Sequence, residues 1–224
     1  MTKIMARSTK GLMMTSLPVQ NRPKDAQLMT RLAPLDAKDL PEEIRPMLDG
    51  AQDLMGFQPN DALVMARNPA LVKGVFAMVS AVYSPDGKVD PGLKRLIGEA
   101  ASKAAGCVYC TAHAAHGASR VGVDDAKIAD LWSYETSPLF SDAERAAIDY
   151  AICASQTPSA VTDEGFEALR AHYDDDEIVE ITAVIAMFGF LNRWNSALAT
   201  ELEDSPLAFA KRLAEQEAKA SNAG

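Results

Sequence analysis

Three observations predict an all-α fold for this chain of 224 residues. Helix-capping signals recur along the chain, apolar residues return at helical spacing, and no segment alternates apolar and polar residues for long enough to make a convincing strand. The hydrophobic content of 48% is sufficient for a sizeable buried core. We therefore expect a helical bundle, with a weak internal repeat described below.

Composition restricts the compartment and the partners. The net charge of -9 argues against a nucleic-acid partner, because such proteins need a basic surface to displace counterions. Three cysteines, two of them close together, do not make the disulfide framework of a small secreted domain, so a reducing cytoplasm is predicted. The longest apolar runs are too short to cross a bilayer, and no membrane association is expected.

The chain is predicted to divide into three parts. Residues 1–30 contain no acid before Asp25 and no sustained apolar face, which favours a disordered extension or an early start codon over a transit peptide. Residues 31–204 form the helical domain. Residues 205–224 form an amphipathic C-terminal helix with a frayed tail.

The helices of the domain are predicted from their caps, in chain order. Residues 36–55 have helical spacing divided by Pro41 and Pro46, and residues 56–61 form a loop that ends at an N-cap. Further starts are predicted at Asn68-Pro69, Asp90-Pro91, Gly106, Asp124, the Ser141/Glu144 capping box, the stretch after Pro158, and Asp174–Asp176, the last opening a long apolar helix that ends near Trp194.

The segment from Arg95 to Arg120 carries the chemistry-bearing residues. Cys107 and Cys110 are three residues apart at a predicted helix N-terminus, where two sulfurs can approach closely enough for a disulfide and unpaired amides favour a thiolate. His113 can reach Cys110 across one helical turn and act as its base. His116, one turn further, is more typical of a packing residue. These spacings indicate thiol chemistry.

Several alternatives remain open for this segment. The two cysteines could be small apolar core residues, or part of a two-ligand or intersubunit metal site. A single zinc ion cannot bind Cys107 and His116 of one continuous helix, because they lie roughly 13 Å apart along its axis. A thioredoxin motif would require a preceding strand. Glu99 is either a solvated edge residue or the group that orients a histidine. Cys153 is predicted to be a core residue, and His172 to be exposed.

A weak internal repeat emerges when Arg95 is laid on Glu180. Two Ala/Ile-rich helices then coincide, Cys107 falls on Asn192, and Cys110 falls on Asn195. The overlay also suggests that Arg193 could approach the thiol site from the second half.

The motif GCVYCTAHAAHGA resembles that of the carboxymuconolactone decarboxylase and AhpD-like alkylhydroperoxidase superfamily. GFQPND, RNPALVKGVF and the later segments FSDAERAAIDYA and EIVEITAVIAMFGFLNRW extend the resemblance to its peroxidase-related branch, over roughly Leu32 to Leu202. The resemblance implies an all-helical oligomer in which Cys110 is the peroxidatic thiolate, Cys107 is the resolving thiol, a histidine is the base and a glutamate completes a proton relay.

Two positions depart from the family pattern. The usual histidine lies four residues after the second cysteine, where this chain has Ala114, so His113 is the nearest substitute. The usual glutamate lies twelve residues before the first cysteine, where this chain has Arg95. Glu99 or Glu180 could take its place, or neither does and the relay is incomplete.

The function predicted from these residues and the resemblance is a thiol-dependent hydroperoxide reductase in antioxidant defence. Its site would comprise Cys110, Cys107, His113 and Glu99, with no bound cofactor and no metal. Its partners would be a hydroperoxide, an external lipoyl or thioredoxin-like dithiol, and further copies of the chain in a trimer or hexamer. The alternatives are a carboxymuconolactone decarboxylase-type lyase and a non-catalytic redox-sensing oligomer.

Overall fold

The computed structural model of the protein describes residues 30–221. All regular secondary structure in this range is helical. Within this range there are ten α-helices, three short 3-10 helices and no strand, which confirms the all-α prediction. The α-helices are α1 (Arg45–Met55), α2 (Asn60–Met65), α3 (Pro69–Val82), α4 (Pro91–Ala104), α5 (Val108–Arg120), α6 (Asp125–Ala129), α7 (Asp142–Ala154), α8 (Asp163–Arg170), α9 (Asp175–Leu198) and α10 (Asp204–Ser221). The predicted extension over residues 1–30 lies almost wholly outside the described residues.

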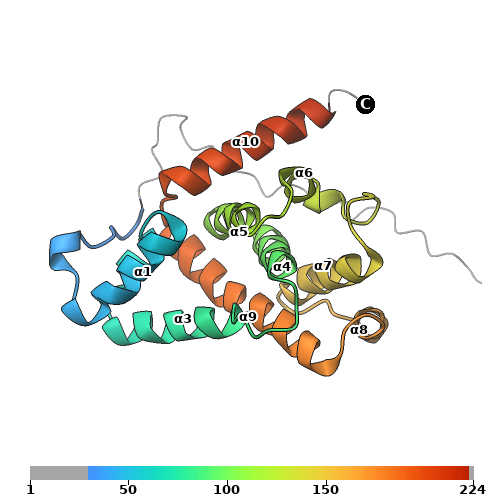
Figure 1. Ribbon diagram of the computed structural model, residues 1–224, viewed down its shortest axis with the longest axis horizontal. Coiled ribbons are helices and arrows are strands. Elements are labelled where there is room, and N and C mark those ends of the chain that lie inside the picture. The colour runs from blue at the N-terminus through green and yellow to red at the C-terminus, as the bar shows by residue number, and fades with distance from the viewer. Residues whose placement is uncertain (1–29, 222–224) are drawn as a thin grey trace, which may run out of the picture.

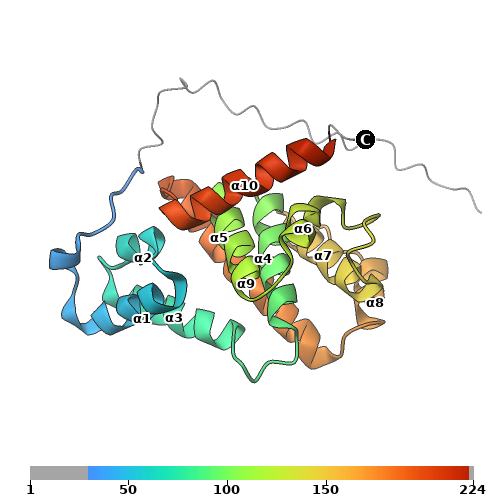
Figure 2. The ribbon, with the colours of Figure 1, turned by 45° about the horizontal axis from the view of Figure 1, so that its top comes forward.

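Helix α4 lies at the centre of the bundle. It packs against α5, α7 and α9. Helix α10 lies across α5 and α6 (Figures 1 and 2). The first helices, α1 to α3, gather at one end around their own small apolar cluster, which includes Ile44, Leu48 and Val72. Helix α3 connects this end to the main bundle through its contact with α9.

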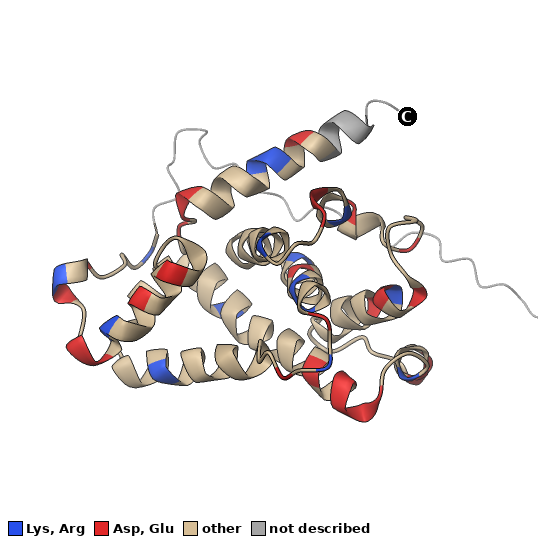
Figure 3. Ribbon diagram, in the orientation of Figure 1, with Lys and Arg blue, Asp and Glu red and all other residues tan. Residues whose placement is uncertain are grey.

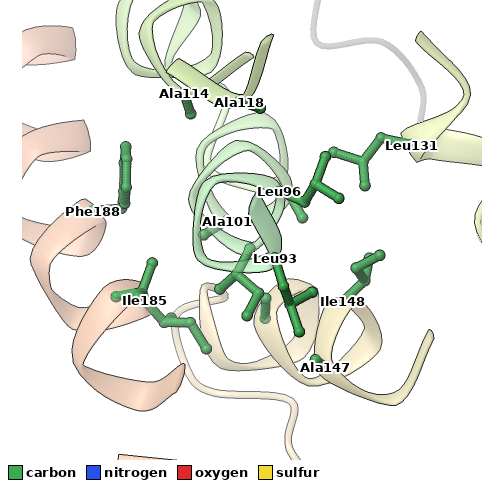
Figure 4. Close-up of a cluster of buried hydrophobic side chains, with 14 of the residues drawn as sticks. Leu93, Leu96, Ala101, Ala114, Ala118, Leu131, Ala147, Ile148, Ile185 and Phe188 are labelled. Carbon is green, nitrogen blue, oxygen red and sulfur yellow. The ribbon is translucent and has the colours of Figure 1, made fainter. Parts of the chain in front are cut away.

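The main core surrounds α4 because that helix is buried on most of its faces. Leu93, Leu96 and Ala101 of α4 meet Ala114 and Ala118 of α5, Ala147 and Ile148 of α7, and Ile185 and Phe188 of α9 (Figure 4). The small side chains of α4 and α5 let the two helices approach closely. Gly98 likewise lets α4 approach α9 closely, because a Cβ atom at this position would collide with the ring of Phe188.

The predicted helix starts are confirmed where a side-chain cap was read from the sequence. Asn68 and Asp90 each cap a helix that begins with proline, and Ser141 with Glu144 forms the predicted capping box. Pro46 differs from the prediction: it lies in the first turn of α1, where a missing N–H costs no helical hydrogen bond, and therefore does not divide the segment. Helix α9 also continues past Trp194 to Leu198.

Charged residues lie mainly on the outer turns. Acidic side chains cluster at the N-terminal turn of α9, where Lys88 bridges Asp174 and Asp176 (Figure 3). Helix α10 covers α5 with Phe209 and Leu213, which are both buried. None of the described helices combines the length and the apolar character needed to cross a membrane.

Candidate active site

The two cysteines lie at the N-terminus of α5, where the chain turns out of α4. Gly106 makes this turn with a φ of 71°, a left-handed conformation that glycine adopts without strain. Cys107 is the N-cap of α5, and its Sγ accepts a hydrogen bond from the amide of Cys110 at 3.5 Å. Both cysteines are reduced, and each is only 2% exposed. The helix N-terminus therefore holds the pair side by side in a dry environment.

The surroundings of the pair favour a thiolate on Cys107. The thiol of Cys110 donates a hydrogen bond to Cys107, and this bond, together with backbone amides and Ser196, lowers the pKa of Cys107 to about 6 despite the opposing effect of burial. The same hydrogen bond, with burial and the negative charge on Cys107, raises the pKa of Cys110. These shifts favour a thiolate on Cys107, at the helix N-terminus, beside a neutral thiol on Cys110.

Cys110 is surrounded by polar groups from two distant segments. Asn195 of α9 directs its Nδ2 atom at both the Sγ of Cys110, at 3.3 Å, and Oδ2 of Asp61, at 3.2 Å. Desolvation raises the pKa of Asp61, although the nearby charge of His113 opposes that rise. A carboxyl group with a raised pKa therefore shares the Asn195 donor with the second thiol.

His113 is held by a carboxylate from the segment before α10. Its Nε2 atom lies 2.6 Å from Oε2 of Glu203, and its ring stacks on Tyr109 with 4.2 Å between centroids. The hydroxyl of Tyr109 donates to Oε1 of Glu203 at 2.8 Å, and the amide of Asn60 donates to the same oxygen at 2.5 Å. Burial acts to raise the pKa of Glu203, but the hydrogen bond and charge of His113 lower it overall.

The site residues predicted from the sequence do not all come together in the structure. Cys107, Cys110 and His113 lie on one helix, but His113 turns toward Glu203, and no hydrogen bond joins its ring to either sulfur within the described residues. Glu99 is buried on α4, so the interpretation of a solvated edge residue was wrong; its predicted part in a relay stays a prediction. Glu180 forms an ion pair with the buried Lys94 at 2.7 Å.

Three of the remaining histidine and cysteine predictions can also be compared. His116 packs between the rings of Phe57 and Phe209, and desolvation lowers its pKa, as suits the predicted packing residue. His172 is exposed, as predicted, and Cys153 is only partly buried. No group of three or more His, Cys, Asp or Glu side chains in the described part of the chain is arranged to hold a metal ion.

Four residues of the site were not identified from sequence: Asp61, Tyr109, Asn195 and Glu203. Asn195 carried a signal, because the repeat overlay equates it with Cys110 and the two side chains meet in the fold. Glu203 carried none, because it reaches the site only after Ala199 ends α9 in a left-handed conformation with a φ of 50°.

Comparisons with known proteins agree with this fold. The family described as the carboxymuconolactone decarboxylase family matches residues 69–152. Among proteins of known sequence, the uncharacterized protein YnjA of Escherichia coli (strain K12) is 35% identical over 111 residues, which cover 49% of this chain and 60% of YnjA. The match thus covers less than two thirds of that relative.

Two solved structures resemble nearly the whole described domain. The debrominase Bmp8 superimposes with a TM-score of 0.75 at 34% identity, covering 81% of this chain and 97% of Bmp8. Bmp8 has also been solved as a cysteine-to-alanine variant in complex with 2,3,4-tribromopyrrole. A peroxidase-related protein with an alkylhydroperoxidase AhpD core, from Ralstonia eutropha JMP134, superimposes with a TM-score of 0.71 at 26% identity, covering 79% of this chain and 94% of that one.

Proposed function

Since the chain belongs to the carboxymuconolactone decarboxylase and AhpD-like superfamily, we propose that it is an enzyme that reduces hydroperoxides with the Cys107–Cys110 pair. The observation that carries the proposal is the placement of Cys107 at the N-cap of α5, where its sulfur accepts from the amide of Cys110 and lies beside the Cys110 thiol, surroundings that lower the pKa of Cys107 to about 6. Such a pair holds an ionised nucleophile at neutral pH and a thiol that can resolve its oxidised form.

The first step of the proposal is attack by Cys107. Its thiolate forms a bond to the outer oxygen of the hydroperoxide, the O–O bond breaks, and the departing alkoxide takes up a proton from solvent water to leave as an alcohol. Cys107 is left as a sulfenic acid. This order exchanges the roles that the family resemblance implies, in which Cys110 is the peroxidatic thiolate; it is supported by the position of Cys107 at the N-cap of α5 and by the lowered pKa of its thiol.

The second step is resolution by Cys110. Asp61 accepts the Cys110 proton, while the Nδ2 donor of Asn195 stabilises the thiolate that forms. The Cys110 sulfur then attacks the sulfur of Cys107, and hydroxide leaves with that proton as water. An external dithiol, oxidised to its own disulfide, returns two electrons and two protons to the pair. His113, held in place by Glu203, supplies the nearby positive charge that opposes the rise in the pKa of Asp61.

Reductive debromination is a second candidate function, favoured by the similarity to Bmp8 over almost all of that chain. The same pair could remove bromine from an aryl bromide, with a proton taking its place, and release bromide when the disulfide forms. Both reactions use the same thiolate and the same resolving thiol, so the substrate distinguishes them.

The test is turnover of the reduced protein with a dithiol and one of three substrates: hydrogen peroxide, tert-butyl hydroperoxide or 2,3,4-tribromopyrrole. We expect multiple turnovers with a hydroperoxide, abolished in Cys107→Ser and in Cys110→Ser. Cys153→Ser is the matched control and should keep the wild-type rate, because Cys153 lies outside the pair. Bromide release without peroxide turnover would replace the first function by the second, and a single oxidation without turnover would indicate a redox sensor.

A further inference from the structure

A cavity of about 460 Å³ opens between the C-terminal end of α4, the segment that follows α7 and the last turns of α9. Its polar lining comes from Ser155, Gln156, Thr157, Asn192, Arg193 and Ser196. Ser196 also lies close enough to Cys107 to lower the pKa of its thiol. A molecule in this cavity would therefore be separated from the proposed nucleophile by the side chain of Ser196, and the cavity is large enough for a small organic ligand.

Arg193 gives this cavity a single positive charge. Its guanidinium donates to the carbonyl of Gly189 at 2.8 Å and, more weakly, to the hydroxyl of Thr157 at 3.4 Å. No carboxylate of the described residues forms an ion pair with it, and none lines the cavity. On a chain with a net charge of -9, an arginine without a carboxylate next to a reactive thiol is suited to a ligand anion.

Asn192 is the second independent observation. Its side chain lines the same cavity and is only 4% exposed, yet neither the nitrogen nor the oxygen of its amide has a hydrogen-bond partner within the described part of the chain. An unpaired buried amide destabilises a fold, because both groups have lost their water. A ligand that reached this amide would restore the missing bonds.

We propose that this cavity binds the carboxylate of an organic substrate through Arg193 and Asn192, and so places the reacting group of that substrate against Cys107. A planar carboxylate fits the forked guanidinium, and one positive charge matches a monoanion. The proposal rests on the proposed function only in that Cys107 is the reacting group.

A second cavity, of about 430 Å³, opens near Glu203 but does not suit such a ligand. Glu201, Glu203 and Asp204 line it, so an anion would be repelled. The carboxylate preference is therefore assigned to the cavity next to Ser196 alone.

The test compares the alkylation of Cys107 by iodoacetate and by iodoacetamide, which differ by a carboxylate in place of an amide. Rates are followed by mass spectrometry and divided by those of a small free thiol. We expect this normalised ratio of iodoacetate to iodoacetamide to exceed one in the wild type. It should fall by about tenfold in Arg193→Gln, as for the loss of a charge-assisted hydrogen bond. Arg193→Lys should keep part of the preference, and Arg170→Gln, an exposed arginine on α8, is the matched control.

Asn192→Leu keeps the proposal testable if Arg193→Gln does not fold. The leucine removes the unpaired amide at similar volume, so thermal stability should hold or rise while the preference for iodoacetate falls. A ratio unchanged in both variants, or an equal fall for both reagents, would overturn the proposal. Because alkylation needs no hydroperoxide, this test can succeed even where peroxide turnover fails.

Discussion

Removal of the Cys110 thiol should make Cys107 less reactive at neutral pH. The variant Cys110→Ala deletes the side-chain donor that contributes most to the low pKa of Cys107, and leaves the amide of residue 110 in place. Cys110→Ser is the matched comparison, because its hydroxyl can donate in place of the thiol. The prediction concerns the thiolate of Cys107 only, and does not depend on which substrate the enzyme uses.

The magnitude follows from the fraction of thiolate. At a pKa of about 6, about nine-tenths of Cys107 is ionised at pH 7, whereas a thiol of pKa about 8.5 is only about 3% ionised. Complete loss of the shift would therefore slow alkylation about 30-fold at pH 7. Because the amide donors remain, we expect roughly a tenfold fall in Cys110→Ala and a smaller one in Cys110→Ser.

The assay is the rate of iodoacetamide alkylation of Cys107 between about pH 4 and pH 9, resolved by peptide mass spectrometry. For the wild type, the rate should reach half its plateau near pH 6, because the thiolate is the reactive form. The midpoint should move upward in Cys110→Ala. A wild-type midpoint near the ordinary thiol value, or an unchanged midpoint in Cys110→Ala, would refute the reasoning.

Further predictions concern the acid at the site and the packing of α4. Glu203→Gln should flatten the loss of stability below about pH 5. The pKa of Glu203 is lowered by His113, so the ionised carboxylate stabilises the folded protein at any pH above the unfolded pKa of this group. That stabilisation is lost as the pH falls through the folded pKa. Urea unfolding at several pH values would show this, and parallel curves for both proteins would contradict it. Gly98→Ala should destabilise the protein by about 1–3 kcal/mol, because its Cβ would collide with Phe188, whereas Gly74→Ala, with open space around it, should not. Thermal unfolding of the two variants decides this, and equal melting temperatures would show that Phe188 moves aside.

Much of the fold could be predicted from sequence because local signals set helix starts. A polar cap followed by proline or by a glutamate three residues later determines how the first turn satisfies its amides, and this information lies within a few residues. Asn68, Asp90 and Ser141 illustrate this, since each caps the helix predicted for it. Ends were harder to predict, as α9 shows by continuing past Trp194.

The candidate site was only half predictable because half of it depends on tertiary packing. Cys107, Cys110 and His113 lie within α5 or at its N-cap, and the three-residue spacing of the two cysteines alone brings their groups together. The direction in which His113 turns depends on Glu203, which approaches from a segment about 90 residues away. Likewise, Asp61 reaches Cys110 only because α2 packs near the end of α9, which no local pattern encodes.

The most direct test of the two-cysteine site is the oxidation of the reduced protein with one equivalent of hydroperoxide, followed by peptide mapping. We predict a disulfide between Cys107 and Cys110, with Cys153 left as a thiol, because only the first two cysteines are hydrogen-bonded to each other. In Cys110→Ser, the same treatment should leave a sulfenic acid on Cys107. A disulfide that includes Cys153, or no loss of thiols at all, would contradict the account.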